Sequence, residues 1–156
     1  MILDKTDQLL LELLQTDAKQ SVKALASKVN LSSTAVYERI KNLERKQIIK
    51  KYTIEIDPEK VEKEFLSFCM IQLAKHSQAY LLEFERKIQT LDEVLACFHI
   101  SGSYDYMLKI RVKNLTEYRS FMVDKLTTIP HIANTQSAFS INEVKSNKGI
   151  KLIKQI

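Results

Sequence analysis

The stretch SVKALASKVNLSSTAVYERIKNLERKQIIKK, residues 21–51, decides how the N-terminal part of the chain folds. Apolar side chains recur at helical spacing from Val22 to Val29 and again from Val36 to Leu43. Between these stripes, Asn30 tolerates the left-handed backbone that ends a helix, and Ser32 or its neighbour can cap the next one. Two helices joined by a tight turn, the second with a polar outer face, form a helix-turn-helix.

Positive charge is concentrated on the second of these helices and on the segment that follows it. The whole chain carries a net charge of +5. Six basic residues and one acid, Glu44, lie between residues 39 and 51: Arg39, Lys41, Arg45, Lys46, Lys50 and Lys51. Such a run on an isolated helix is usually a solvated face. On the outer face of a helix-turn-helix, it predicts contacts with DNA phosphates, which need clustered positive charge.

The two ends of this second helix are expected to play different roles on DNA. Its N-terminal residues should meet base edges, and the basic residues farther along should contact phosphates, which position a protein without specifying sequence. Glu38 suits either a cytosine amino group or charge balance on its own helix, and we favour the second. The predicted DNA-binding set is Ser32, Ser33, Thr34, Tyr37, Glu38, Arg39, Lys41, Asn42, Arg45 and Lys50.

The part of the chain from Phe65 onward alternates strand and helix patterns. We expect strands at 65–75, 94–101, 104–113 and 132–145, and helices at 78–91 and 115–129. The order β-α-β-β-α-β is that of a ferredoxin-like domain, an antiparallel sheet with helices on one face. The run FLSFCMIQLAK at 65–75 is apolar on both faces, so the second face should meet another subunit, which predicts at least a homodimer.

These patterns together predict an α+β protein with four segments. Residues 1–50 should form the helix-turn-helix domain, opened by a first helix over residues 4–15, and residues 65–145 the ferredoxin-like domain. Between them, Ile48 to Asp57 alternate with period two before Pro58, so 51–64 should be a hinge strand and linker. Residues 146–156 form a basic tail without acids.

Several other classes of protein are disfavoured by the sequence. No apolar run approaches the roughly 20 residues that span a bilayer, and the N-terminus lacks a secretory signal pattern. Cys69 and Cys97 lie in apolar runs and should be buried thiols of a cytoplasmic protein, with no metal site. The three histidines are far apart and phosphate-binding glycine loops are lacking, so we expect neither an enzyme nor a cofactor. Aromatic residues are not interleaved with the basic cluster, which disfavours RNA binding.

Motifs along nearly the whole chain resemble those of the Lrp/AsnC (feast/famine) family of bacterial and archaeal regulators. They are LDKTD..LL..LQ.DA at 3–18, LA..V.LS.T.V.ERI..LER at 25–45, SGSYDYMLKIRV at 101–112, PHIANTQS at 130–137 and EVKSN at 143–147. The resemblance implies a winged type of helix-turn-helix on double-stranded DNA and a C-terminal domain for effector binding and oligomerisation. It also implies homodimers that assemble further, often into octamers, with amino acids bound between dimers.

The resemblance also implies which residues hold the amino acid. They are the loop residues Gly102, Ser103, Tyr104 and Asp105, with Thr135, Gln136, Ser137 and Ala138 of the last strand contributing from nearby. Gly102 lets a backbone approach a ligand closely, and Asp105 is a carboxylate that can receive an ammonium group. The alternative is a plain connecting turn in which Asp105 only caps.

Three positions depart from the family pattern and bear on function. Gln47 and Lys50 stand where the family usually has glycines, so we expect the hinge to be set at a different angle. His131 replaces a usual glycine near the ligand loops, which predicts an effector other than leucine. We therefore expect a sequence-specific transcriptional regulator that responds to an amino acid. The alternative is an architectural DNA-binding protein of the same fold that needs no effector.

Overall fold

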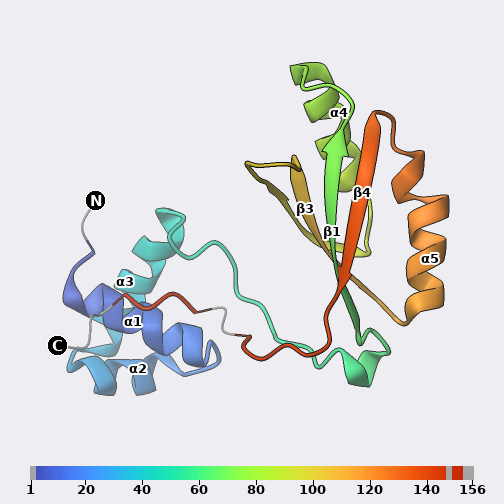
Figure 1. Ribbon diagram of the computed structural model, residues 1–156. Coiled ribbons are helices and arrows are strands. Elements are labelled where there is room, and N and C mark those ends of the chain that lie inside the picture. Colours follow the sequence, from blue (N-terminus) through green and yellow to red (C-terminus); the bar gives the residue numbers. More distant parts are fainter. Residues whose placement is uncertain (1–2, 147–148, 153–156) are drawn as a thin grey trace. The chain divides into compact units, whose positions relative to one another are not determined.

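The computed structural model describes residues 3–146 and 149–152 of the chain, which divides into two compact units. One unit comprises Met1–Glu55 together with Lys145–Ile156, and the other Ile56–Val144. We call them the helix-turn-helix unit and the sheet unit. The predicted α+β class is confirmed, with helices alone in the first unit and a four-stranded antiparallel sheet with helices in the second (Figure 1).

Three helices form the helix-turn-helix unit, and a side chain caps the start of each one. They are α1 (Lys5–Thr16), α2 (Val22–Val29) and α3 (Ser33–Arg45). The N-terminal caps are Asp4, Ser21 and Ser32, whose side chains accept from the backbone N–H groups three residues ahead. Asn30 ends α2 in the left-handed conformation, with φ 52° and ψ 46°. Leu10, Leu25 and Val36, one from each helix, are buried in the core of the unit.

Strands and helices alternate in the sheet unit as predicted. In chain order they are β1 (Phe65–Leu73), α4 (Gln78–Ile88), β2 (Val94–His99), β3 (Tyr106–Val112), α5 (Leu115–Asp124) and β4 (Ile132–Phe139), with single 3-10 turns at Glu59–Val61 and Leu126–Thr128. The strand order is β2-β3-β1-β4, with every pair antiparallel. β4 ends earlier than predicted because it pairs with β1, which begins at Phe65 and offers no partner beyond that point.

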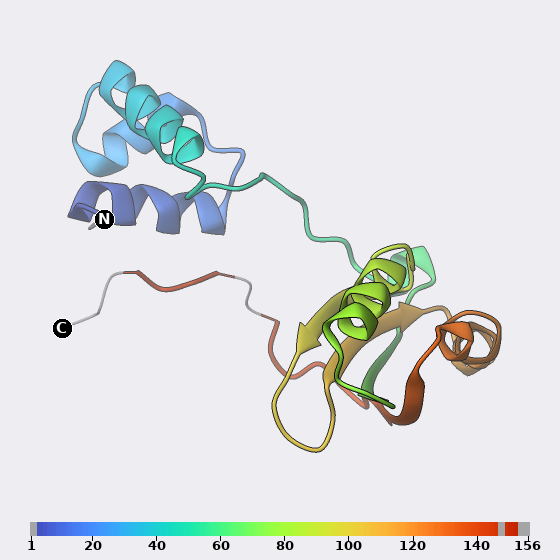
Figure 2. The same ribbon diagram turned by 90° about the horizontal axis from the view of Figure 1, so that it is seen from above.

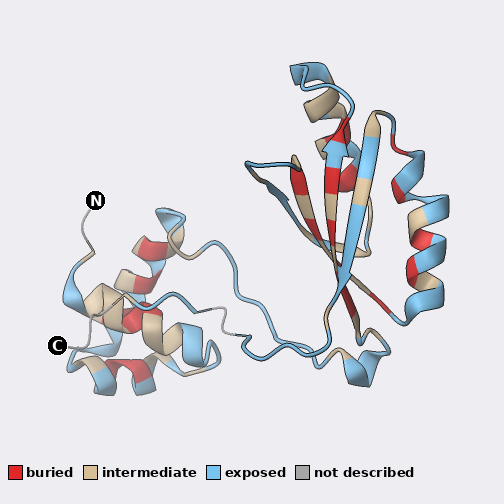
Figure 3. Cartoon of the chain, viewed as in Figure 1, coloured by how far each residue is buried: buried red, intermediate tan, exposed pale blue. Residues whose placement is uncertain are grey.

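The two faces of this sheet are covered differently. Side chains of β1 and β3 on one face, including Ile71 and Leu108, pack against Phe84 of α4 and Phe121 of α5 in one buried core. The register pairs Met70 with Met107 and with Gln136, so these side chains share the opposite face. No described helix contributes to that face, which we call the open face. Its apolar members include Phe68, Met70, Met107 and Phe98, all at least partly exposed. Figure 3 shows buried residues along β1 and β3 and mostly exposed ones along β4.

Two sequence-based expectations, one about the hinge segment and one about Cys97, were wrong. The predicted hinge strand at 48–57 contains no strand, because a strand needs a partner ladder and no described segment of this chain pairs with it. Ile54 and Ile56 of this segment are exposed. Cys97 is exposed rather than buried, because β2 is an edge strand. Among the described residues, no helix is long and apolar enough to cross a membrane.

Candidate functional site

The outer side of α3 carries a row of exposed polar residues. Thr34, Tyr37 and Lys41 are spaced three and four residues apart, so they follow one another along one side of the helix. Of the predicted DNA-binding set, Ser32, Ser33, Thr34, Tyr37, Glu38, Lys41, Arg45 and Lys50 are exposed, whereas Arg39 and Asn42 are partly buried. The opposite side of α3, with Val36, Ile40 and Leu43, is buried. This division presents a polar surface on a rigidly packed helix.

A carboxylate on α3 links this surface to the segment that follows the helix. Glu44 accepts from the Lys41 ammonium at 2.8 Å and from the Tyr52 hydroxyl at 2.9 Å. The Lys41 hydrogen bond is the largest cause of the lowered pKa of Glu44, followed by the hydrogen bond from Tyr52. Burial and the hydrogen bond to Glu44 raise the pKa of Tyr52 to about 12. Lys41 also lies 5.7 Å from the centre of the Tyr37 ring, so one ammonium is held between an acid and an aromatic face.

Arg39 has partners within the chain that the sequence did not suggest. Its Nη1 lies 2.7 Å from Asp4 Oδ2 and 2.7 Å from Asp7 Oδ1, so it joins α3 to the start of α1. The backbone N–H of Asp7, and then Arg39, hold the pKa of Asp4 below its ordinary value, and Asp4 raises the pKa of Arg39. The guanidinium predicted to contact phosphate is therefore already shared by two carboxylates. Asn42, farther along, accepts from Arg45 at 3.1 Å.

The predicted effector loop connects β2 to β3 and is tied to the end of β1. Gly102 has a φ of 129°, a backbone conformation that side chains with a Cβ rarely adopt. Asp105 Oδ2 accepts from the backbone N–H of Leu73 at 2.7 Å, and Oδ1 lies 2.7 Å from His76 Nε2. Asp105 thus caps the end of β1 with one oxygen, and its other oxygen faces a histidine that is largely exposed.

The four predicted ligand residues of β4 point to both faces of the sheet. Successive strand residues alternate, so Thr135 and Ser137 share the helix-covered face, while Gln136 and Ala138 share the open face. Ser137 Oγ lies 2.6 Å from the hydroxyl of Tyr118 on α5. Gln136 Oε1 accepts from the hydroxyl of Tyr104 at 2.7 Å, which brings the loop and β4 together. Of the two predicted groups of ligand residues, Tyr104 and Gln136 are the pair joined by a hydrogen bond.

The sequence pointed to His131 near the ligand loops but did not reveal its partners, an aromatic ring and a carboxylate. The rings of Tyr80 and His131 stack with centres 3.6 Å apart, and His131 Nε2 lies 3.7 Å from Glu83 Oε2. His131 has a φ of 71°, which explains why glycine suits this position. The backbone bond from Ala74 N–H to the His131 carbonyl brings this turn beside the residues that follow β1. Only the register of β1 against β4 could have revealed this cluster, because its members are distant in sequence.

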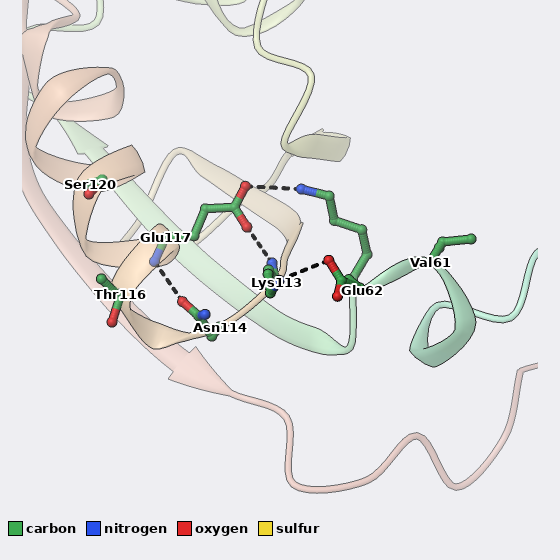
Figure 4. Close-up of a pocket in the computed structure, with 8 residues that line it drawn as sticks. Val61, Glu62, Lys113, Asn114, Thr116, Glu117 and Ser120 are labelled. Carbon is green, nitrogen blue, oxygen red and sulfur yellow. Dashed lines mark hydrogen bonds and ion pairs between the residues drawn. The ribbon is translucent and has the colours of Figure 1, made fainter.

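A separate hollow of about 560 Å³ lies where the linker reaches α5 (Figure 4). Its charged side chains neutralise one another: Lys63 pairs with Glu117 at 2.9 Å, and Lys113 with Glu62 at 2.8 Å. Asn114 caps α5 by accepting from the Glu117 N–H. The hollow is wide open and its charged groups already pair with one another, so we assign it no ligand. The described residues also contain no group of three or more His, Cys, Asp or Glu side chains placed to hold a metal ion.

Comparison with known proteins agrees with this two-unit architecture. Residues 3–44 match the AsnC-type helix-turn-helix domain, and residues 66–150 match the Lrp/AsnC ligand binding domain. The Bkd operon transcriptional regulator of Pseudomonas aeruginosa is 36% identical over 142 residues, covering 91% of this chain and 93% of its own. The leucine-responsive regulatory protein of Escherichia coli is 32% identical over 145 residues, covering 93% and 88%. A Neisseria meningitidis transcriptional regulator, solved in complex with L-Met, superposes with a TM-score of 0.91 at 27% identity, covering 96% of each chain.

Proposed function

The chain belongs to the Lrp/AsnC family of transcriptional regulators, which are not enzymes, and from this membership we propose a mechanism for its two units. The helix-turn-helix unit binds operator DNA through α3. An amino acid, bound at the loop end of the sheet unit between neighbouring copies, changes the DNA binding or the assembly of the protein. The observation that carries the proposal is the exposed polar row on α3 opposite a buried apolar stripe.

For DNA, we assign different contacts to the two ends of α3. Thr34 and Tyr37 are exposed near its N-terminal end, which in helix-turn-helix proteins meets base edges. Lys41, Arg45 and the following Lys50 are exposed cations for phosphates. We leave Arg39 out of the primary phosphate set, because Asp4 and Asp7 already hold it.

For the effector, we assign Asp105 as the acceptor of the ligand ammonium. One of its oxygens is committed to the Leu73 N–H, and the other faces His76, whose side chain is 68% exposed. An ammonium group can replace the histidine at this oxygen without breaking the bond to β1. Gly102, Ser103, Tyr104 and Gln136 complete the polar surroundings. The complex of the Neisseria relative with L-Met supports an amino acid as the class of ligand.

Thermal unfolding with each amino acid tests the effector assignment. A ligand that binds only the folded protein, present at a hundred times its Kd, stabilises it by about 2.7 kcal/mol. Asp105→Asn is the informative variant, because its amide oxygen still accepts from the Leu73 N–H while the charge is lost. We expect near-normal stability without ligand and a lost response to the effector. A full response in Asp105→Asn would exclude this carboxylate as the ammonium site.

We also propose that the open face of the sheet joins two copies. Phe68, Met70, Met107 and Phe98 form a partly exposed apolar strip there, with Lys109 and Arg111 on the same face. A contiguous apolar surface on one side of a sheet usually marks an interface. Further assembly into octamers is the family arrangement that we expect this dimer to follow.

One observation favours a second candidate, an architectural DNA-binding protein without an effector. Two polar side chains of the loop are already paired within the chain, Tyr104 with Gln136 and Asp105 with His76. The same thermal experiment separates the two candidates. If no amino acid raises the unfolding temperature while the protein still binds DNA, the architectural function holds and the effector assignment fails.

A further inference from the structure

The C-terminal tail lies beside the first helix of the helix-turn-helix unit and is bonded to it (Figure 2). The side-chain amide of Gln15 donates to the carbonyl of Ile150 at 3.1 Å, and its oxygen accepts from the Ile150 N–H at 2.6 Å. Glu12 Oε1 accepts from the N–H of Leu152 at 2.9 Å. Two side chains from one face of α1 therefore bind the backbone of an extended segment.

In this arrangement, side chains of α1 recognise the backbone of the tail rather than its side chains. Gln15 satisfies both the N–H and the carbonyl of one residue, as a neighbouring strand would in a sheet. The side chain of Ile150 contributes little to the contact, since it is 72% exposed. The bonded N–H groups belong to residues 150 and 152, whereas Lys151, between them, donates its N–H to no residue that the structure describes. This alternation is the pattern of an edge-on strand contact.

We propose that Glu12 and Gln15 of α1 form a docking site for an extended peptide backbone and that the occupant is this chain's own tail, residues 149–152. The tail acts as a releasable strap. It is held by hydrogen bonds of partly exposed groups, which open more readily than buried ones. The proposal concerns α1 and the tail alone and does not depend on the assigned DNA or effector contacts.

The tail is connected to α3 through α1, because α1 contacts both of them. α1 carries the tail through Glu12 and Gln15 near its C-terminal end, and through Asp4 and Asp7 at its start it holds Arg39 of α3. Whatever displaces or removes the tail acts on the helix that supports α3. Because recognition is by backbone, another extended segment can compete for the site whatever its side chains.

Amide hydrogen exchange on the full-length protein, followed by mass spectrometry of overlapping tail peptides, tests the proposal. We expect the amides of residues 150 and 152 to exchange slowly and that of 151 rapidly. Gln15→Ala should accelerate exchange in the tail about 10-fold, since both bonds to Ile150 are lost. The matched control is Gln8→Ala, which removes a glutamine of the same helix whose amide donates to the Leu3 carbonyl instead. An unchanged rate of amide exchange in the tail of Gln15→Ala would overturn the proposal that Gln15 holds the tail.

A pair of tail variants tests the claim that backbone is recognised. Ile150→Pro removes the N–H that Gln15 accepts, and Ile150→Ala keeps it. The first should release the tail, and the second should leave its exchange as in the wild type. Equal effects of the two variants would contradict backbone recognition. Dilution identifies the occupant: protection by the chain's own tail is independent of protein concentration, and protection that disappears on dilution would assign the segment to a second copy and overturn the proposal.

Discussion

The helix-turn-helix unit and the sheet unit leave two different kinds of surface uncovered. On α3 the exposed residues are polar and basic, and the apolar side of the helix is buried in the core of the unit. On the sheet, the helices cover one face, while apolar side chains such as Phe68 and Met70 remain partly exposed on the other. The difference supports the proposals made for each unit: α3 as the surface that meets DNA, and the open face as the surface that a second copy covers.

The largest effect is expected where the sheet unit meets its partner. Phe98→Asp introduces a charge on the open face at a side chain that is 49% exposed in the single chain. In a dimer it would be buried without a partner, which should weaken association by at least about 2 kcal/mol, roughly thirtyfold in Kd. Light scattering coupled to size exclusion measures the dissociation.

Leu82→Asp is the matched control for that variant. Leu82 is 58% exposed on α4, outside the open face, so the same charge there should leave the assembly unchanged. If the Phe98→Asp protein dimerised as well as the wild type, the open face would not be the dimer interface, and the proposed difference between the two units would be contradicted.

A smaller effect is expected from the basic residues of α3, and it should separate two of them. Arg39→Ala leaves the carboxylates of Asp4 and Asp7 without their guanidinium, which should cost about 1 kcal/mol of unfolding free energy after allowance for solvent screening. Lys41→Ala should leave stability nearly unchanged, weaken binding to all DNA sequences and reduce the salt dependence by about one phosphate contact. Urea unfolding and DNA titrations at several salt concentrations measure both quantities.

Arg45→Ala serves as the reference for these two variants. Arg45 is exposed on α3 and bonded to the Asn42 amide rather than to a carboxylate, so its loss should resemble that of Lys41. If Arg39→Ala flattened the salt dependence as much as Lys41→Ala, Arg39 would leave its carboxylates for a phosphate, as the sequence alone had predicted.

Arg39 also illustrates what the sequence could reveal and what it could not. Apolar spacing predicted the helices and strands, because periodicity follows directly from which side of an element is buried. The partners of Arg39, however, lie 32 and 35 residues away in the chain, and helical spacing says nothing about them. The same limit explains the missed contact between His76 and Asp105, which depends on the turn after β1 meeting the loop before β3.

The faces on which the β4 residues lie, and the structure of the hinge, could not be predicted from the sequence for two further reasons. Residues 135–138 matched a family motif as one block, but strand alternation divides them between two faces, and only Gln136 is bonded to the loop. The alternation at 48–57 predicted a strand, but it could not supply the pairing partner that a strand needs, and the structure has no strand there. Whether such a segment is a strand depends on a neighbour rather than on its own residues.

The smallest expected effect tests whether α3 holds the start of that segment. Tyr52 donates to Glu44, and burial together with this bond raises the pKa of Tyr52 to about 12. An unfolded tyrosine has a pKa of about 10. The folded state therefore keeps its proton longer, so the stabilisation is complete below pH 10 and is lost as the pH rises towards 12. Glu44→Gln keeps an oxygen acceptor but removes the charge, which should lower the pKa of Tyr52 part of the way back.

Phenolate absorbance measures this titration, with Tyr52→Phe subtracted to isolate Tyr52 from the other five tyrosines. Glu38→Gln is the control, since it removes a carboxylate of the same helix that has no bond to Tyr52. A midpoint that Glu44→Gln leaves unchanged would mean that burial alone raises the pKa. The segment after α3 would then be held by packing of the Tyr52 ring rather than by its hydrogen bond to Glu44, and Glu44 would be free to balance Lys41.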